Sequence, residues 1–317
     1  MLTFIQYLSE SEGNVHNEVM GRVYERATAL HLHDNSGASK NSDPEYKQKI
    51  EKMRTDQEAD KKLLPNNVRD TSISRGHASS EAYLKSLHKQ GIEANDIHEV
   101  HHTSKSIDHL VGEKVDRSQN PHDVVIKTKK GTLHGASLKA TSGTLSNNGV
   151  GSISKHGKHT GIAGNTSEIW EKGKKKAGLE SLSMKQIQSM RDDPKVKSIY
   201  ADTQKESAKH HMDTFNKATH ANKIKHMEML MKLGYHKSVP YDYVVGEKGT
   251  SESIEDKYHV HLLRSAKKLV ATQKNNRVHI HDENNNHILS IEHRSVYGAF
   301  SGTQVNAKLS AVKKETE

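Results

Sequence analysis

The stretch that decides the fold is PHDVVIKTKKGTLHGASLK, residues 121–139. Its VVI run is a short apolar segment of residue types that favour strands. The KKG that follows is typical of a tight turn, and the chain then returns with two leucines in TLHGASLKA. The pattern predicts a β-hairpin in which Asp123 opens the first strand and Lys139 lies on the second. Paired strands of this length can bring both side chains to one end of a sheet.

The pairing of an acid with a lysine at a strand end indicates a kind of chemistry. A carboxylate such as Asp123 can hold a hard divalent cation, and an ammonium such as Lys139 can orient a water or steady a phosphate. Taken singly, Asp123 also fits a turn residue at the start of a strand, and Lys139 fits a charged residue that protects a sheet edge. Their occurrence together on one hairpin favours the chemical interpretation.

A helix is expected before this hairpin. Apolar residues recur at spacings of three and four over 14–33, which predicts an amphipathic helix with Asn14 as its N-cap. Glu18 and Glu25 lie seven residues apart and therefore on one face of it. The first ten residues, MLTFIQYLSE, have no basic leader and no small-residue cleavage site, so we expect a short docking helix there and no secretory signal.

The segments between this helix and the hairpin are more polar. Residues 34–76 are expected to be an insertion, a loop that carries a charged helix over about 45–62. A second helix should follow Ser79 or Ser80 and end at Gly91. The residues DIHEVHHTS, 96–104, then predict a strand around 97–104.

After the hairpin we expect a Gly, Asn and Ser-rich loop over 141–165, a helix in SEIWEKGKKKAG, and a helical region over 182–233 with Pro194 as a break. Alternation predicts a strand over 257–264, and two more strands flank the turn DENNN. The expected domains are a nuclease-like core at 1–180 and a second region at 181–317 that is first helical and then rich in β-strands. The last strands of the second region could also complete the sheet of the core.

Composition limits the class of protein. Only 32% of residues are hydrophobic and 4% aromatic, so the core is thin for 317 residues. The chain has 48 Lys and Arg against 39 Asp and Glu, with 24 His in addition, and this basic balance favours a polyanionic partner. The lack of cysteine excludes disulfides, thiolate zinc sites and a cysteine nucleophile. The lack of cysteine fits a reducing, cytoplasmic location. The sequence contains no run of 18 apolar residues, the length that would suggest a membrane-spanning helix.

Together, these features resemble the PD-(D/E)xK nuclease superfamily, in which a helix with Glu precedes a strand with Asp and a strand with acid-x-Lys. GRVYER, residues 21–26, is similar to the G-x-x-x-E-R of archaeal Holliday-junction resolvases. The resemblance implies an α/β fold with a mixed central sheet flanked by helices, here with a helical insertion and C-terminal α+β additions. It further implies that Glu25 and Asp123 bind Mg²⁺ or Mn²⁺ and that Lys139 aids catalysis, with Glu18 as the substitute for Glu25.

The sequence departs from the family pattern at Ser137. The superfamily usually has Asp or Glu two residues before the lysine, and a neutral hydroxyl is a poorer magnesium ligand. Some restriction enzymes with Ser at this place supply the acid from the following helix, where this chain has Glu168 and Glu171. If neither reaches the site, the fold would persist as a binding module.

Lysines around the proposed site in sequence predict contacts with phosphates, although the KGKKK run also fits a solvated helix face. The scarcity of aromatic residues favours a duplex backbone over stacked single strands, so DNA is the expected partner, with RNA left open. The candidate DNA-binding residues are Lys127, Lys129, Lys130, Lys155, Lys158, Lys174, Lys175 and Lys176.

The histidines could suggest zinc or a His-Asn-His nuclease. However, no pair has a third ligand at a recognisable spacing, and strand HxH pairs are often only a polar face. We expect His98 and His101 to be at most neighbours of the site.

The sequence therefore predicts a magnesium-dependent DNA endonuclease in the cytoplasm. A viral origin and a homodimer are both compatible with this prediction. The alternative is a protein that binds nucleic acid or acts in virion assembly through the same basic surface, without catalysis.

Overall fold

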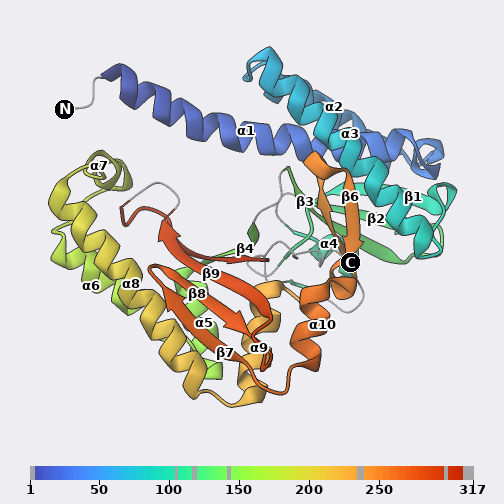
Figure 1. The fold of residues 1–317 in the computed structure, drawn as a ribbon. Coiled ribbons are helices and arrows are strands. Elements are labelled where there is room, and N and C mark those ends of the chain that lie inside the picture. Colours follow the sequence, from blue (N-terminus) through green and yellow to red (C-terminus); the bar gives the residue numbers. More distant parts are fainter. Residues whose placement is uncertain are drawn as a thin grey trace, which may run out of the picture. The chain divides into compact units, whose positions relative to one another are not determined.

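The computed structural model describes residues 4–103, 106–115, 120–140, 144–233, 239–295 and 299–309, without the side chains of 4–17 and 144–147. The described chain is a mixed α/β structure with two five-stranded sheets (Figure 1). It divides into two compact units, each with its own sheet. The first unit comprises Met1–Ser142 and Gly234–Ile254, and the second comprises Gly143–Leu233 and Glu255–Glu317. None of the described helices is long and apolar enough to cross a membrane.

The first unit contains a mixed sheet with the strand order β1-β2-β3-β5-β6. Neighbouring strands are antiparallel except β3 and β5, which run parallel. The hairpin of β2 and β3 forms as the sequence predicts, with Val124 opposite Ala136 and a turn that contains Gly131 at φ +82°. The strands are β1 (Ile97–His102), β2 (Val124–Thr128), β3 (Leu133–Lys139), β5 (Tyr241–Val245) and β6 (Thr250–Ser253).

Three long helices pack on one face of this sheet. Tyr24, Tyr83 and Leu138 belong to the same buried cluster, which joins the helices to the strands. A smaller cluster around Val125 and Ile107 covers the other face. The helices of this unit are α1 (Phe4–Asp34), α2 (Pro44–Lys61), α3 (Asn66–Lys89) and α4 (Asp108–Val111), with the short 3-10 helices η1 (Gly37–Lys40), η2 (Ala94–Asp96) and η3 (Gly246–Lys248). A further 3-10 helix, η4 (Ile254–Asp256), begins at the last residue of this unit.

The helical predictions here are partly confirmed. The helix over 14–33 and the charged helix near 45–62 are both present, but α1 begins at Phe4, so Asn14 lies inside it and is not its cap. The expectation that the polar stretch 34–76 ends in a loop and that the next helix follows Ser79 or Ser80 was wrong, because α3 begins at Asn66.

The reason for this error is the composition of α3. Most of its serines do not face solvent: Ser72, Ser79, Ser80 and Ser86 are buried, and Ser74 is exposed. At Gly76 an added Cβ would lie 2.7 Å from the Cβ of Ala27 on α1. Small side chains let α1 and α3 pack closely, so a polar-looking segment is in fact a packing face. The segment is part of the helical layer and not a detached insertion.

The second unit has an antiparallel sheet with the order β4-β10-β9-β8-β7. Helices α5, α8 and α9 contribute to the core of this unit, and α10 packs beside β9. Its elements are β4 (Thr144–Gly149), α5 (Val150–Thr160), α6 (Thr166–Lys176), α7 (Met184–Ser189), α8 (Pro194–Lys217), α9 (His220–Met231), α10 (Tyr258–Ser265), β7 (Val270–Lys274), β8 (Arg277–His281), β9 (His287–Ser295) and β10 (Thr303–Lys308).

Several predictions for this part of the chain were confirmed, namely the helix after 166, the helical region to 233 and the strand pair around residues 282–286. The loop predicted over 141–165 was wrong for residues 144–160, because β4 pairs with β10 and α5 follows directly. Residues 161–165 do form a loop between α5 and α6, and residues 141–143 lie outside the described part. The strand over 257–264 is instead α10, whose buried residues His259, Val260 and Leu263 have helical spacing.

The domain expectation also differs from the structure. The chain leaves the first unit near 142, returns to it near 234 and leaves again after 254, so residue 180 is no boundary. The last strands do not complete the first sheet, since β7 to β10 pair with β4 in a sheet of their own.

The core of the second unit contains a chain of buried histidines. His211 on α8 is hydrogen-bonded at 3.1 Å to His293 on β9 and at 2.9 Å to His226 on α9. His293 is bonded in turn to Ser207 at 2.8 Å. All three rings are fully buried, and burial lowers the pKa of His211 to about 3 and the pKa values of His226 and His293 well below 6.5. The folded unit therefore keeps these rings neutral.

We predict that the second unit loses stability in mild acid. Below about pH 6.5 the unfolded chain protonates these histidines while the folded unit does not, so protons favour unfolding as the pH falls from 6.5 toward 3. Each histidine should lower the unfolding free energy by about 1.4 kcal/mol per pH unit in this range. Urea unfolding at pH 7.5 and 5.0, followed by fluorescence of the buried Trp170, measures the effect.

The variant His211→Leu should weaken this pH dependence, whereas His220→Leu, at an exposed histidine, should leave it unchanged. An unfolding midpoint that is the same at both pH values in the unmodified protein would contradict the prediction.

Candidate functional site

The candidate site lies at the end of the first sheet where β2 begins and β3 ends. One carboxylate oxygen of Asp123 accepts a hydrogen bond from the backbone N–H of Leu138 at 2.6 Å, and the Lys139 ammonium lies 3.9 Å from the same oxygen. Lys139 also donates to the Ser137 hydroxyl at 3.0 Å. Asp123, Ser137 and Lys139 thus come together at one end of the hairpin.

The backbone around Asp123 is held on both sides. Its N–H donates to the carbonyl of Ala136 at 2.8 Å, and its carbonyl accepts from the N–H of Thr103 at 3.0 Å. The ring of His122 packs over Gly135, where an added Cβ would fall 1.8 Å from a ring carbon. Glycine is therefore required at 135 for His122 to lie where it does, and the position of Asp123 does not depend on a flexible loop.

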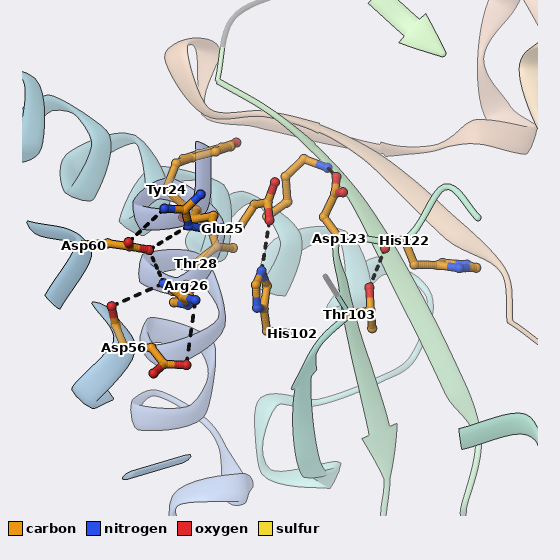
Figure 2. A network of polar contacts seen from close by, with 12 residues as sticks. Tyr24, Glu25, Arg26, Thr28, Asp56, Asp60, His102, Thr103, His122 and Asp123 are labelled. Atoms are coloured by element: carbon orange, nitrogen blue, oxygen red, sulfur yellow. Dashed lines mark hydrogen bonds and ion pairs between the residues drawn. The ribbon is translucent and has the colours of Figure 1, made fainter. Parts of the chain in front are cut away.

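Glu25 reaches the site from the helical layer. One of its carboxylate oxygens is 2.9 Å from the Nε2 of His102, the last residue of β1 (Figure 2). His102 pairs with Val124 across the sheet, which places it next to Asp123 at the same strand end. Figure 2 shows Glu25, His102 and Asp123 close to one another. The helix and the three strands therefore supply side chains to one region.

The two arginines beside Glu25 are engaged elsewhere. Arg22 donates twice to Asp60 on α2, at 2.9 Å each. Arg26 donates to the same carboxylate (Figure 2). The hydrogen bond from Arg22 is the main cause that holds the pKa of Asp60 below its ordinary value. A Glu on a helix usually pairs with a basic neighbour on the same helix. Here the two arginines bind Asp60 instead, so they do not pair with Glu25. A Cβ at Gly21 would meet nothing within 4 Å, and nothing in the structure explains that glycine of GRVYER.

Tyr24 connects α1 to the end of β3. Its hydroxyl donates to the carbonyl of Lys139 at 3.0 Å and lies 2.7 Å from the Ser79 hydroxyl. Burial raises the pKa of Tyr24 most, and the charges of Asp123 and Glu25 raise it further. Both carboxylates therefore act on one buried hydroxyl.

The other residues of the first unit that the sequence suggested lie away from this region. Glu18 is exposed and about 10 Å along the helix from Glu25, given a rise of about 1.5 Å per residue. Lys129 and Lys130 lie in the hairpin turn, about 20 Å from Asp123 at about 3.3 Å per strand residue. Lys127 is bound by Glu99 at 2.9 Å. These three lysines are near the site in sequence but not in space, because the hairpin carries them to its far end.

The remaining candidates belong to the second unit. The carboxylates Glu168 and Glu171 are exposed on α6, so the prediction that one of them is a metal ligand stays a prediction. The lysines there lie on α5 and in the last turn of α6: Lys155, Lys158, Lys174, Lys175 and Lys176.

Sequence reasoning missed His102 and Tyr24. It considered His98 and His101 as neighbours of the site, but successive strand residues point to opposite faces, and His101 turns away to Glu99 at 2.9 Å. His98 is beside Asn41, at 3.4 Å. The signal that could have selected His102 is the alternation of β1, which places His102 on the same face as the buried Val100, toward the helix that carries Glu25.

The donors at this site are two carboxylates, a hydroxyl and an imidazole. Within the described ranges, no three His, Asp or Glu side chains form a group placed to hold a metal ion. Magnesium nevertheless needs few protein ligands, because it keeps several waters and is often bound by one or two carboxylates together with substrate phosphates. The oxygen donors of Asp123 and Glu25 fit that requirement.

Comparisons with protein-family models, with curated proteins and with solved structures found no match to this chain.

Proposed function

We propose that this protein is a magnesium-dependent DNA endonuclease that hydrolyses phosphodiester bonds at the site of Asp123, Glu25 and Lys139. The observation that carries the proposal is the placement of the Lys139 ammonium 3.9 Å from Asp123, at a strand end that Glu25 also reaches. A restriction-endonuclease-like core is proposed with it. The support is a Glu-bearing helix that precedes three antiparallel strands and a fourth strand, β5, parallel to β3.

Each residue has a proposed task. Asp123 and Glu25 would hold Mg²⁺ or Mn²⁺, which lowers the pKa of bound water and stabilises charge on phosphate oxygens when present. Lys139, steadied by Ser137, orients the attacking water and counters the negative charge of the phosphate. Hydrolysis adds the water oxygen to phosphorus and breaks one phosphoester bond, whose oxygen leaves with a proton. His102 holds Glu25 in position.

The alternative is a protein that binds nucleic acid without cutting it. The observation that favours it is Ser137, which puts a neutral hydroxyl where the acid-x-Lys pattern has a carboxylate. The two functions differ in a single assay, since both predict binding and only one predicts strand breaks.

We predict that Mg²⁺ or Mn²⁺ supports cleavage of plasmid DNA and that EDTA abolishes it. Asp123→Asn and Lys139→Ala should each lower the cleavage rate by a factor on the order of 100 or more while DNA affinity changes only a few-fold, because both act on the reacting phosphate. Gel assays of supercoiled plasmid, combined with binding to labelled duplex, measure the two effects.

The matched control is Lys127→Ala, which removes a lysine from the same hairpin at its far end and should leave the rate unchanged. Normal cleavage by either site variant, or robust cleavage in excess chelator, would show that the assignment is wrong.

Ser137 gives a second prediction. Ser137→Asp places a carboxylate beside Lys139 and Asp123, so the Mg²⁺ concentration that gives half-maximal cleavage should fall by about tenfold, since added anionic oxygen ligands tighten binding of hard cations. Ser137→Ala adds no ligand and should leave that concentration unaltered. A metal requirement that is the same in the Asp variant would place the ion away from residue 137.

A further inference from the structure

The sheet of the second unit has one face in the core, while on the other face polar residues form successive rows beside Val270, with Lys274 and Arg277 exposed. His293 on β9 points toward α8, where it bonds Ser207, so the neighbouring Glu292 points to the opposite side. We call the side of Glu292 the outer face of this sheet.

Cross-strand register shows which residues share the outer face. Lys274 pairs with Arg277, Arg277 with Glu292, and Glu292 with Asn306. A parallel row and a shorter one are also polar throughout. Their members are Thr272, His279, Ser290 and Lys308 in one row and Arg294 and Gln304 in the other.

The charge on these rows is strongly positive. Glu292 is the one carboxylate in them, and it is already bound by Arg277 at 2.9 Å and by Lys308 at 2.7 Å. Although burial opposes its ionisation, hydrogen bonds from these two cations lower the pKa of Glu292. Lys274 and Arg294 have no ion pair among the described residues, so the four cations of the rows exceed their one anion by three.

The ratio of basic to acidic residues on this face is higher than in the chain as a whole. Over the whole chain, 48 Lys and Arg stand against 39 Asp and Glu, so the fourfold excess on this face is a local concentration of positive charge. The four strands that carry these rows, β7 to β10, span about 14 Å at about 4.8 Å between neighbours, and duplex DNA presents one charge per about 1.7 Å of its axis. Several phosphates therefore fit along the face. His279 adds a polar ring, held by the Ser290 hydroxyl at 2.9 Å.

We propose that this outer face binds the phosphate backbone of DNA, with Lys274 and Arg294 as its two unpaired contacts. The inference rests on the proposed function for its choice of partner and assigns the second unit the task of holding the substrate. Glu292 organises the face, because it fixes Arg277 and Lys308 at the centre.

The test is binding of a fluorescein-labelled 30-base-pair duplex, measured by anisotropy in EDTA over a range of salt concentrations. The double variant Lys274→Gln/Arg294→Gln should bind more weakly, and its slope of log affinity against log salt should fall by about 1.8, from about 0.9 per lost phosphate contact. Circular dichroism checks that this double variant and the control variant described next are folded.

The matched control is Lys195→Gln/Lys205→Gln, which removes two exposed lysines from α8, the helix on the opposite side of the sheet. Its slope should equal that of the unmodified protein. An unchanged slope in the double variant, an equal loss in the control, or failure of the unmodified protein to bind the duplex would overturn the proposal. Tighter binding of an RNA duplex would also overturn the choice of DNA. Because EDTA removes cleavage from the measurement, a protein that binds by this face but never cuts contradicts the nuclease function alone.

Discussion

The antiparallel register of β2 and β3 is the constraint on which the candidate site depends. It pairs Val124 with Ala136, and this puts the Asp123 carboxylate on the N–H of Leu138 and beside Lys139. A slip of one residue would turn every side chain of a strand to the other face. On β3 such a slip would turn the polar Ser137 and Lys139 toward the helical cluster in which Ala136 and Leu138 are now buried, and this cost resists the slip. The packing of the core therefore also fixes the geometry of the site.

The helical layer adds the second half of the site through polar contacts. Asp60 gathers Arg22 and Arg26 and so fastens α2 to α1, while the Tyr24 hydroxyl ties α1 to the carbonyl of Lys139. Between these two attachments, Glu25 is directed toward His102. The GRVYER segment thus combines residues for structure with one residue for chemistry. This division explains why the arginines next to Glu25 do not neutralise it.

Local sequence patterns were sufficient for the hairpin and for the part of α1 after residue 14, because alternation, turn residues and helical spacing are properties of short segments. They failed where a distant partner decides. β4 is a strand because β10 pairs with it from about 160 residues further along the chain, and most serines of α3 are buried because α1 lies against them. The histidines of 257–264 suggested alternation, but the residues that are buried there follow a helix. In the site, spacing predicted Asp123 and Lys139, whereas His102 depends on the face that β1 turns toward α1.

The central claim is that Asp123 and Glu25 hold one divalent ion beside Lys139. Its most direct test is anomalous diffraction from crystals of the protein with a DNA duplex and Mn²⁺, at a manganese concentration that supports cleavage. The account predicts an anomalous peak within about 2.0–2.6 Å of carboxylate oxygens of both residues, the range for such hard cations. A peak elsewhere, or density without an ion between these two carboxylates, would contradict it.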